Sequence, residues 1–236
     1  MNLHYKFIKP GSFYSIPDED REVVIRFNTI GADSWDKSLK DDIGFEDGDI
    51  SKRTKFKKEI KKHLIKMQES YCYYCGRSFF LFGENEKRFS RNIHIDHILP
   101  KKATHGRYGR FTFETQNLIL ACSICNGRDF KGSLDFCIEP SDDYDVMSFS
   151  IVHPYFEDIN QHFRIEDDGT ALKINRDKSK ATVMERVFGI NSTYMIESRL
   201  QNLTYIRQNL TPEEEDVITE ITKKIPIDGI TSQSIS

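Results

Sequence analysis

Two short segments with the same cysteine spacing, YCYYCG at residues 71–76 and ACSICN at residues 121–126, decide how this chain folds. Cys72 and Cys75 form the first Cys-x-x-Cys, and Cys122 and Cys125 form the second. A tight turn of this kind places two sulfurs about 2.3 Å from one tetrahedral Zn²⁺, and a second turn completes the ligand shell. A redox dithiol is the alternative for either pair alone, whereas two matched pairs favour structural zinc. We therefore predict one zinc site made of these four cysteines.

The composition is that of a folded, water-soluble protein. The chain has 236 residues and a mass of 27.6 kDa, with 38% hydrophobic and 30% charged residues. This length suits one domain with additional segments, and the composition excludes disordered and fibrous classes. The longest apolar runs have four or five residues, far below the roughly 20 needed to cross a bilayer. The first 15 residues lack the apolar run of a secretory signal, so we expect no membrane span and a cytoplasmic location.

Charge is distributed unevenly along the chain. The net charge is −3 overall, but residues 51–131 carry 18 basic and seven acidic side chains, a net charge of +11. The flanking residues 1–50 and 132–236 have net charges of −5 and −9. A locally positive surface is what binding to phosphate groups requires. The alternative is a solvated, lysine-rich helix.

The pattern of apolar residues predicts an α+β fold. Between residues 51 and 70, Phe56, Ile60, Leu64 and Met67 recur at helical spacing among many lysines, which predicts a basic amphipathic helix. We also expect strands at Val23–Phe27, Asn92–Leu99 and Asn117–Ala121, a short helix beginning within Asn126–Leu134, a hairpin of Phe163–Ile165 and Ala171–Ile174 around Asp167–Thr170, and helices at Lys178–Phe188, at Ser192–Gln208 and from Thr211.

These elements divide the chain into three expected segments. Residues 1–50 form an N-terminal extension, and residues 51–137 hold the basic helix and the zinc-bound domain. Residues 138–236 contain an acidic linker, the hairpin and a mostly helical C-terminal region.

The residues between the two cysteine pairs form a recognisable motif. HIDHILPK occupies residues 94–101, Asn117 precedes a leucine, and Asn126 directly follows the last cysteine. Within two Cys-x-x-Cys pairs, this order resembles the zinc-stabilised form of the HNH, or His-Me finger, endonucleases over about residues 71–131. The resemblance implies a ββα-metal core clamped by the four-cysteine zinc site. It also implies that His97 is the general base, that Asp96 and Asn126 hold one divalent metal ion, and that Asn117 supports the loop carrying the base.

The chemistry of phosphodiester hydrolysis agrees with these roles. An imidazole has an ordinary pKa of about 6.5, which suits a base that deprotonates water near neutral pH. Mg²⁺ or Mn²⁺ held by a carboxylate and an amide oxygen would neutralise charge on the phosphate and on the leaving oxygen. Neighbouring residues of a flat strand point to opposite faces. A twist or bulge must therefore bring Asp96 and His97 to one cleft.

The same middle segment offers basic side chains for contacts with the phosphate backbone. Such contacts position a nucleic acid without reading its bases. The candidates are Lys101, Lys102, Arg107, Arg110, Arg128 and Lys131.

Together these features favour a metal-dependent endonuclease, with DNA as the favoured substrate. The size and the flanking segments, with FGIN at residues 188–191 between helices, also resemble nuclease subunits of bacterial anti-phage systems such as Septu and retron-linked systems. That resemblance implies an ABC-type ATPase as partner and a role in antiviral defence. The alternatives are a non-catalytic zinc-ribbon module that binds nucleic acid or protein, and an RNA-cutting nuclease of the same fold.

Overall fold

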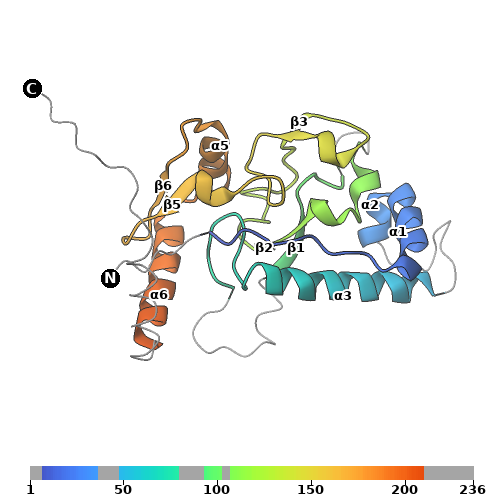
Figure 1. Cartoon of the computed structure of the whole chain (residues 1–236), viewed down its shortest axis with the longest axis horizontal. Helices are drawn as coiled ribbons and strands as arrows, with labels where there is room; N and C mark the ends of the chain where they lie inside the picture. Colours follow the sequence, from blue (N-terminus) through green and yellow to red (C-terminus); the bar gives the residue numbers. More distant parts are fainter. Residues whose placement is uncertain (1–6, 37–47, 80–92, 103–106, 210–236) are drawn as a thin grey trace, which may run out of the picture.

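A computed structural model of the chain describes residues 7–36, 48–79, 93–102 and 107–209. Figure 1 shows α3 running along one side of the molecule, α1 and α2 near one end of it, and α5 and α6 toward the opposite end. The helices are α1 (Asp18–Ile30), α2 (Ala32–Asp36), α3 (Asp49–Met67), α5 (Ser179–Phe188) and α6 (Thr193–Asn209). The strands are β1 (Ile93–His97), β2 (Leu118–Cys122), β3 (Cys137–Glu139), β4 (Ser148–Phe149), β5 (Phe163–Ile165) and β6 (Ala171–Lys173). Single 3-10 turns lie at η3 (Gly109–Phe111), η4 (Thr115–Asn117), η5 (Tyr144–Val146) and η6 (Ile159–Gln161).

The predicted basic helix is confirmed as α3. Its apolar stripe of Phe56, Ile60 and Leu64 is buried, because these side chains recur every four residues and therefore lie on one face. The Nζ of Lys61 donates to the carbonyl oxygen of Ile93 at 3.2 Å, which ties α3 to the start of β1.

The antiparallel pair β1–β2 carries the central motif. Its register runs without a shift from Ile93 opposite Cys122 to His97 opposite Leu118. Gln68, just after α3, contacts β2 through both polar atoms of its side-chain amide. Its Oε1 accepts from Leu120 N at 2.8 Å, and its Nε2 donates to Leu120 O at 3.0 Å. The end of α3 therefore fixes the position of β2 and of the first cysteine turn that follows.

The predicted strand at Val23–Phe27 is wrong, because these residues belong to α1. Val23, Val24 and Phe27 are buried, at a spacing that places them on one face of a helix. Three acidic residues, Asp18 to Asp20, occupy the first turn, where negative charge favours a helix. The run of β-branched residues had favoured a strand.

The predicted helix within Asn126–Leu134 is also absent from the described structure, so the ββα arrangement is not confirmed. The segment consists of successive turns, with Phe130 N and Gly132 N both bonded to the carbonyl oxygen of Gly127. Gly132 has φ of +48°, a left-handed conformation that ends a helical turn. The chain thereby turns back after one turn instead of extending as a helix.

The C-terminal part is mixed rather than mostly helical over its described residues. The hairpin β5–β6 is confirmed, with Phe163 opposite Lys173, and α5 and α6 lie within a residue or two of their predicted bounds. Residues 137–165 instead form short strands and 3-10 turns. The predicted helix from Thr211 lies outside the described residues.

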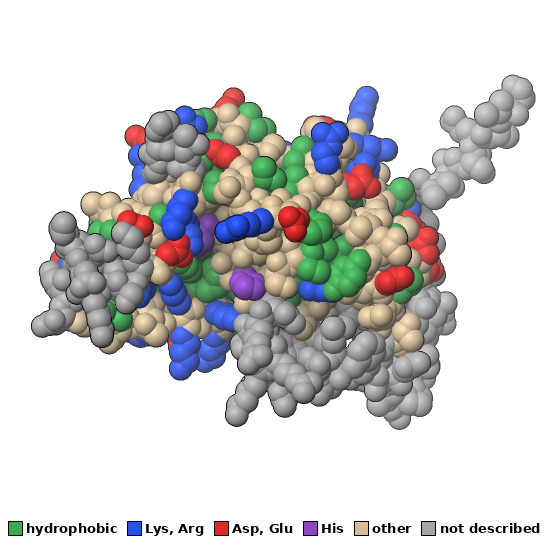
Figure 2. All heavy atoms as spheres, turned by 180° about the vertical axis from the view of Figure 1, so that it is seen from behind, with side chains coloured by type: hydrophobic (Ala, Val, Ile, Leu, Met, Phe, Trp, Pro, Cys, Tyr) green, Lys and Arg blue, Asp and Glu red, His purple; other side chains and the backbone are tan. Residues whose placement is uncertain are grey.

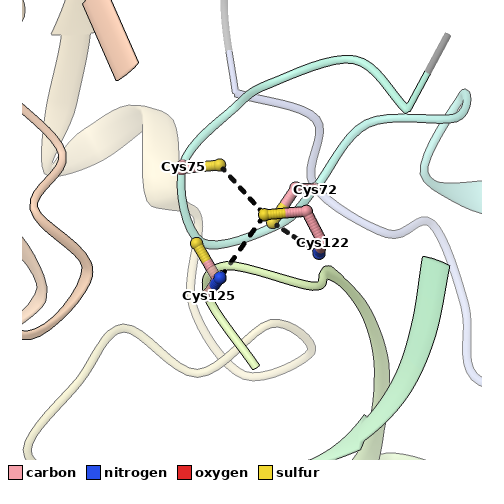
Figure 3. Close-up of side chains that lie close together, drawn as sticks. All are labelled: Cys72, Cys75, Cys122 and Cys125. Atoms are coloured by element: carbon pink, nitrogen blue, oxygen red, sulfur yellow. Dashed lines mark hydrogen bonds between the residues drawn. The ribbon is translucent and has the colours of Figure 1, made fainter. Parts of the chain in front are cut away.

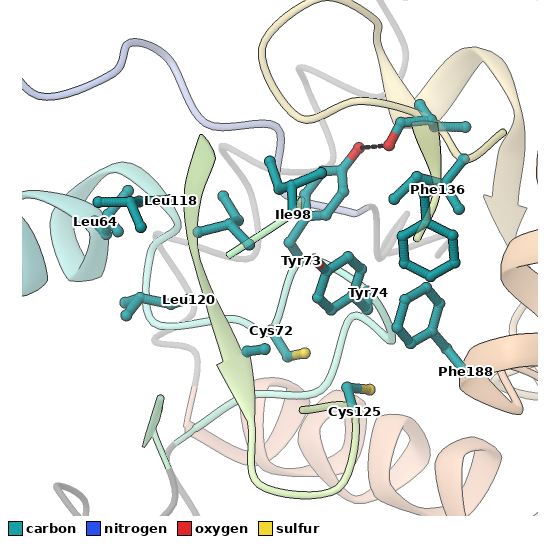
Figure 4. Packing of buried hydrophobic residues seen from close by; sticks show 14 of the residues in the cluster. Leu64, Cys72, Tyr73, Tyr74, Ile98, Leu118, Leu120, Cys125, Phe136 and Phe188 are labelled. Atoms are coloured by element: carbon teal, nitrogen blue, oxygen red, sulfur yellow. Dashed lines mark hydrogen bonds between the residues drawn. The ribbon is translucent and has the colours of Figure 1, made fainter. Parts of the chain in front are cut away.

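One buried cluster joins all three expected segments. It contains Phe7 and Phe27 from the N-terminal extension, the residues around the cysteines, and Phe163 and Phe188 from the C-terminal part. Figure 4 shows Tyr73 and Tyr74 of the first cysteine turn within this cluster, with Tyr74 beside Phe188 and the hydroxyl of Tyr73 hydrogen-bonded at its end. Among the described helices, none is both long and apolar enough to cross a membrane.

Candidate active site and metal centre

The four predicted zinc ligands come together in the structure. The Sγ atoms of Cys72, Cys75, Cys122 and Cys125 all lie within 4.8 Å of one another, and all four residues are buried. Figure 3 shows the side chains converging from two facing turns. Sulfurs about 2.3 Å from one tetrahedral ion lie just under 4 Å apart, and Cys75 Sγ lies 4.0 Å from Cys122 Sγ. The arrangement is that of a metal site, and its all-sulfur donor set indicates zinc.

Two arginines support the cysteine turns. Arg77 is 8% exposed. Hydrogen bonds from the other three thiols lower the pKa of Cys122, and the charge of the Arg77 guanidinium lowers it further. Arg199 of α6 is fully buried and donates to three carbonyl oxygens, those of Cys75, Gly169 and Ile190, at 2.6 to 3.0 Å. With a metal ion bound, a positive charge near the cysteines would offset part of the negative charge of their thiolates. Through its three hydrogen bonds, Arg199 joins the first cysteine turn to the C-terminal hairpin and helices.

Both carboxylate oxygens of Asp96 have partners, one from the first cysteine turn and one from the segment after the second. Tyr74 of the first turn donates its hydroxyl to Asp96 Oδ2 at 2.6 Å. Lys131, six residues after Cys125, places its Nζ 3.1 Å from Asp96 Oδ1 and donates to the carbonyl oxygen of His97 at 2.7 Å. Asp96 and Lys131 are 4% and 1% exposed. The carboxylate is therefore paired on both oxygens and held in a fixed orientation.

His97 is held by a hydrogen bond on one side and by an aromatic ring. Its Nε2 lies 2.9 Å from the carbonyl oxygen of Thr112, and a carbonyl oxygen only accepts, so Nε2 carries the hydrogen and Nδ1 keeps its lone pair. The ring of Trp35 packs perpendicular to the imidazole, with ring centroids 4.6 Å apart and planes at 85°. Burial first, and then the nearby charge of Lys101, lower the pKa of His97 well below its ordinary value. The imidazole is therefore neutral at neutral pH.

Asp96, His97 and Asn126 line a single pocket of about 200 Å³, together with Lys101, Lys102 and Lys131. The β1–β2 register contains no bulge at Asp96 or His97. Of the twist or bulge that was expected to bring Asp96 and His97 to one cleft, the bulge is therefore absent. His97 is the last residue of β1, where the pairing ends and the chain leaves the sheet.

Asn117 lies behind the pocket and holds the loop after β1. Its Oδ1 accepts from the backbone N of Leu99 at 2.7 Å, and its Nδ2 donates to the carbonyl oxygen of Phe111 at 2.9 Å. Asn117 is fully buried. It thus links the segment following His97 to the segment that contains Thr112.

The predicted phosphate contacts differ in their surroundings. Lys101 and Lys102 line the pocket and pair with Asp36 at 2.9 and 3.4 Å. Arg107, Arg110 and Arg128 are exposed, whereas Lys131 is buried against Asp96. Figure 2 shows the molecule from behind the view of Figure 1, and basic side chains gather there over the part where α2 and α3 lie. Five of these six residues are thus at or near the surface, while Lys131 serves an interior ion pair.

Three residues at the site were not singled out from the sequence in these roles. Tyr74 is hidden inside a cysteine turn, Trp35 lies 62 positions before His97, and Lys131 was expected on the surface.

Comparison with known protein families finds one match in the central segment. Residues 72–129 match the family model described as HNH endonuclease. The match covers the four cysteines, Asp96, His97, Asn117 and Asn126. A search among curated proteins finds no significant match.

Proposed function

We propose that this protein is a metal-dependent endonuclease that hydrolyses phosphodiester bonds in DNA at the pocket lined by Asp96, His97 and Asn126. The observation that carries the proposal is the state of His97. Its imidazole is neutral, its Nε2–H donates to the Thr112 carbonyl oxygen, and its Nδ1 would serve as the base. A neutral imidazole fixed at one nitrogen is the form that accepts a proton from water at the other.

The donor set at the pocket fits a divalent ion such as Mg²⁺ or Mn²⁺. Asp96 and Asn126 would supply a carboxylate and an amide oxygen, the hard ligands that these ions prefer. A carboxylate offers about four lone-pair sites, so the contacts of Asp96 with Tyr74 and Lys131 leave sites on both oxygens. When bound, the ion would neutralise charge on the phosphate and on the departing oxygen.

The protein's own groups perform the remaining tasks. His97 takes the proton from the attacking water, and Thr112 keeps the imidazole oriented. Lys101 and Lys102, at the rim of the pocket, position the backbone phosphates by charge, together with the exposed Arg107, Arg110 and Arg128. Asn117 keeps the loop after His97 in place.

The resemblance to anti-phage nuclease subunits extends the proposal to a partner, an ABC-type ATPase, and to a defence role in the bacterial cytoplasm. The acidic flanks, with net charges of −5 and −9, would face such a partner or keep the free protein off nucleic acid. Co-purification with a co-encoded ATPase tests this part, and its absence from the purified protein would remove the partner from the proposal.

The test of the nuclease is cleavage of supercoiled plasmid by wild type, His97→Ala and His94→Ala. His94 is exposed on the same strand and therefore provides a matched control. The protein is dialysed without chelator, so that zinc is retained, and is assayed with and without Mg²⁺ or Mn²⁺. Loss of a general base slows a reaction about 10²–10⁴-fold, and we expect this loss for His97→Ala only, with unchanged zinc content and circular dichroism.

Two results would contradict the proposal. Equal cutting by wild type and His97→Ala would remove His97 as the base. Binding of labelled DNA without cutting by any variant would favour the zinc-ribbon alternative, and a parallel reaction with single-stranded RNA tests the RNA-cutting alternative.

A further inference from the structure

The N-terminal helices reach the pocket through one aromatic side chain. Trp35, the penultimate residue of α2, is 8% exposed and packs its ring perpendicular to that of His97. It also packs on Phe113, with ring centroids 4.9 Å apart. Phe113 directly follows Thr112, whose carbonyl oxygen accepts from His97 Nε2. Trp35 therefore contacts both the imidazole and the segment that holds it.

A single hydrogen bond leaves an imidazole free to tilt about the bond axis. The Thr112 carbonyl oxygen determines which nitrogen carries the hydrogen, but it does not determine the plane of the ring. The perpendicular packing of Trp35 against the imidazole, at an interplanar angle of 85°, restricts that plane. General bases need this restriction, since small errors in the position of a reacting group reduce rates strongly.

Trp35 is itself fixed by contacts from α3. The carbonyl oxygen of Ser34 accepts from Arg53, and that of Trp35 accepts from Lys57, so that α3 binds the last carbonyl groups of α2. The Nζ of Lys57 lies 4.4 Å from the centroid of the Trp35 ring, a distance at which a cation is attracted to the ring face. The five-residue α2 is thereby a rigid support for its tryptophan.

The junction between α1 and α2 also requires close packing on the same segment. Gly31 has φ of +79°, and a Cβ built there would lie 3.3 Å from the Cα of Gly109. Asn28 Oδ1 accepts from the backbone N of Phe113 at 2.7 Å. Residues 28–35 thus contact the segment 109–113 from end to end.

We propose that Trp35 is a positioning residue for His97, so that α1 and α2 complete the active site outside the segment that matches the HNH family. This inference rests on the proposed function for its kinetic consequence, while its structural content concerns the imidazole alone.

The kinetic test compares Trp35→Leu, Trp35→Phe and Phe27→Leu in plasmid cleavage. Phe27 is fully buried in the same aromatic group and contacts Phe113, so Phe27→Leu is a matched loss of a buried ring from α1. We expect Trp35→Leu to lower kcat about 10- to 100-fold with KM within about twofold. Trp35→Phe, which retains an aromatic edge, restores most of kcat, and Phe27→Leu leaves kcat within about twofold of wild type.

The second readout does not depend on activity. Nitrogen-15 correlation spectra of the histidine rings report the Nε2–H of His97 and its exchange with solvent. We expect a protected Nε2–H in wild type, in Phe27→Leu and in Trp35→Phe, and an exchange-broadened or lost signal in Trp35→Leu.

An unchanged kcat and an unchanged Nε2–H signal in Trp35→Leu would overturn the proposal, as would equal loss of kcat in Phe27→Leu. If His97→Ala cuts plasmid as well as wild type, the proposed function fails. The Nε2–H signal then still decides whether Trp35 orients the imidazole.

Discussion

The hydroxyl of Tyr74 donates to Asp96 Oδ2 at 2.6 Å, and this contact joins the first cysteine turn to the pocket. Tyr74 lies between Cys72 and Cys75, and its ring stacks on Phe188 with centroids 4.1 Å apart. Lys131, which follows the second cysteine turn, binds the other oxygen of the same carboxylate. Each cysteine turn thus supplies one of the two groups that hold Asp96, so the metal site and the pocket form one structural unit.

The first prediction concerns this hydrogen bond. Tyr74→Phe should lower the free energy of unfolding by about 1.5–3 kcal/mol, since a hydrogen bond to a charged group is lost, and should also reduce cleavage. Tyr73→Phe is the control: its hydroxyl is equally buried but donates to the carbonyl oxygen of Val152 at 3.0 Å. We expect it to cost about 1 kcal/mol in urea denaturation and to leave cleavage unchanged. Equal activity of the two variants would separate Tyr74 from the pocket.

The second prediction concerns the buried ion pair of Asp96 and Lys131. Lys131→Met leaves a buried carboxylate without its cation and should destabilise the protein by about 3–5 kcal/mol. The double variant Asp96→Asn with Lys131→Met removes both charges and should recover most of that loss. Urea denaturation measures both, with Lys102→Met as the exposed control, for which we expect less than about 1 kcal/mol. A double variant no more stable than Lys131→Met would contradict a direct pairing.

The third prediction concerns the metal centre. Cys125→Ser should abolish the bound zinc measured by atomic absorption and should unfold the segment around β1 and β2, because the energy of binding a structural zinc contributes directly to folding. Cys137→Ser, which alters the partly exposed fifth cysteine, should retain zinc and stability. Full zinc content in Cys125→Ser would show that the metal is held elsewhere.

The fourth prediction concerns stability at acidic pH. Burial first, and then the charge of Lys180, lower the pKa of His153 to about 3, whereas an unfolded histidine has a pKa of about 6.5. As the pH falls below about 6.5, the unfolded chain binds a proton that the folded protein does not, so stability is lost between about pH 6.5 and about pH 3. From about pH 7 to about pH 5 this single group should cost about 2 kcal/mol.

Urea denaturation of His153→Gln at the two pH values checks this expectation. The loss between about pH 7 and about pH 5 should shrink by about 2 kcal/mol relative to wild type. The same substitution at His94, which is exposed, should leave the loss as it is in wild type. An identical loss in wild type and His153→Gln would exclude His153 as the source.

Local patterns were sufficient to predict part of the molecule. The helical spacing of Phe56, Ile60 and Leu64 predicted α3, and the acidic turn at Asp167–Thr170 predicted the β5–β6 hairpin. The four cysteines were found because their spacing alone constrains two turns to one ion. These features depend on residues that are near in sequence or repeat a motif.

Other features depend on contacts between distant segments, which no local pattern contains. The β-branched run near Val23 suits a strand, whereas in the folded protein one face of α1 is buried and its Phe27 packs on Phe113. A lysine after the second turn reads as a surface residue, and only the folded chain shows that Asp96 is its partner. Nothing near Trp35 in the sequence indicates that it lies against His97.

The position of Trp35 also gives the protein an intrinsic optical probe. It is the only tryptophan in the chain, so all indole fluorescence originates 4.6 Å from the His97 ring, with the Nζ of Lys101 5.7 Å from the indole centroid. Binding of a metal ion or an oligonucleotide at the proposed site would change the charges around that indole. Emission from the unlabelled protein should therefore respond to occupancy of the pocket, so that a titration can be followed before any bond is cut.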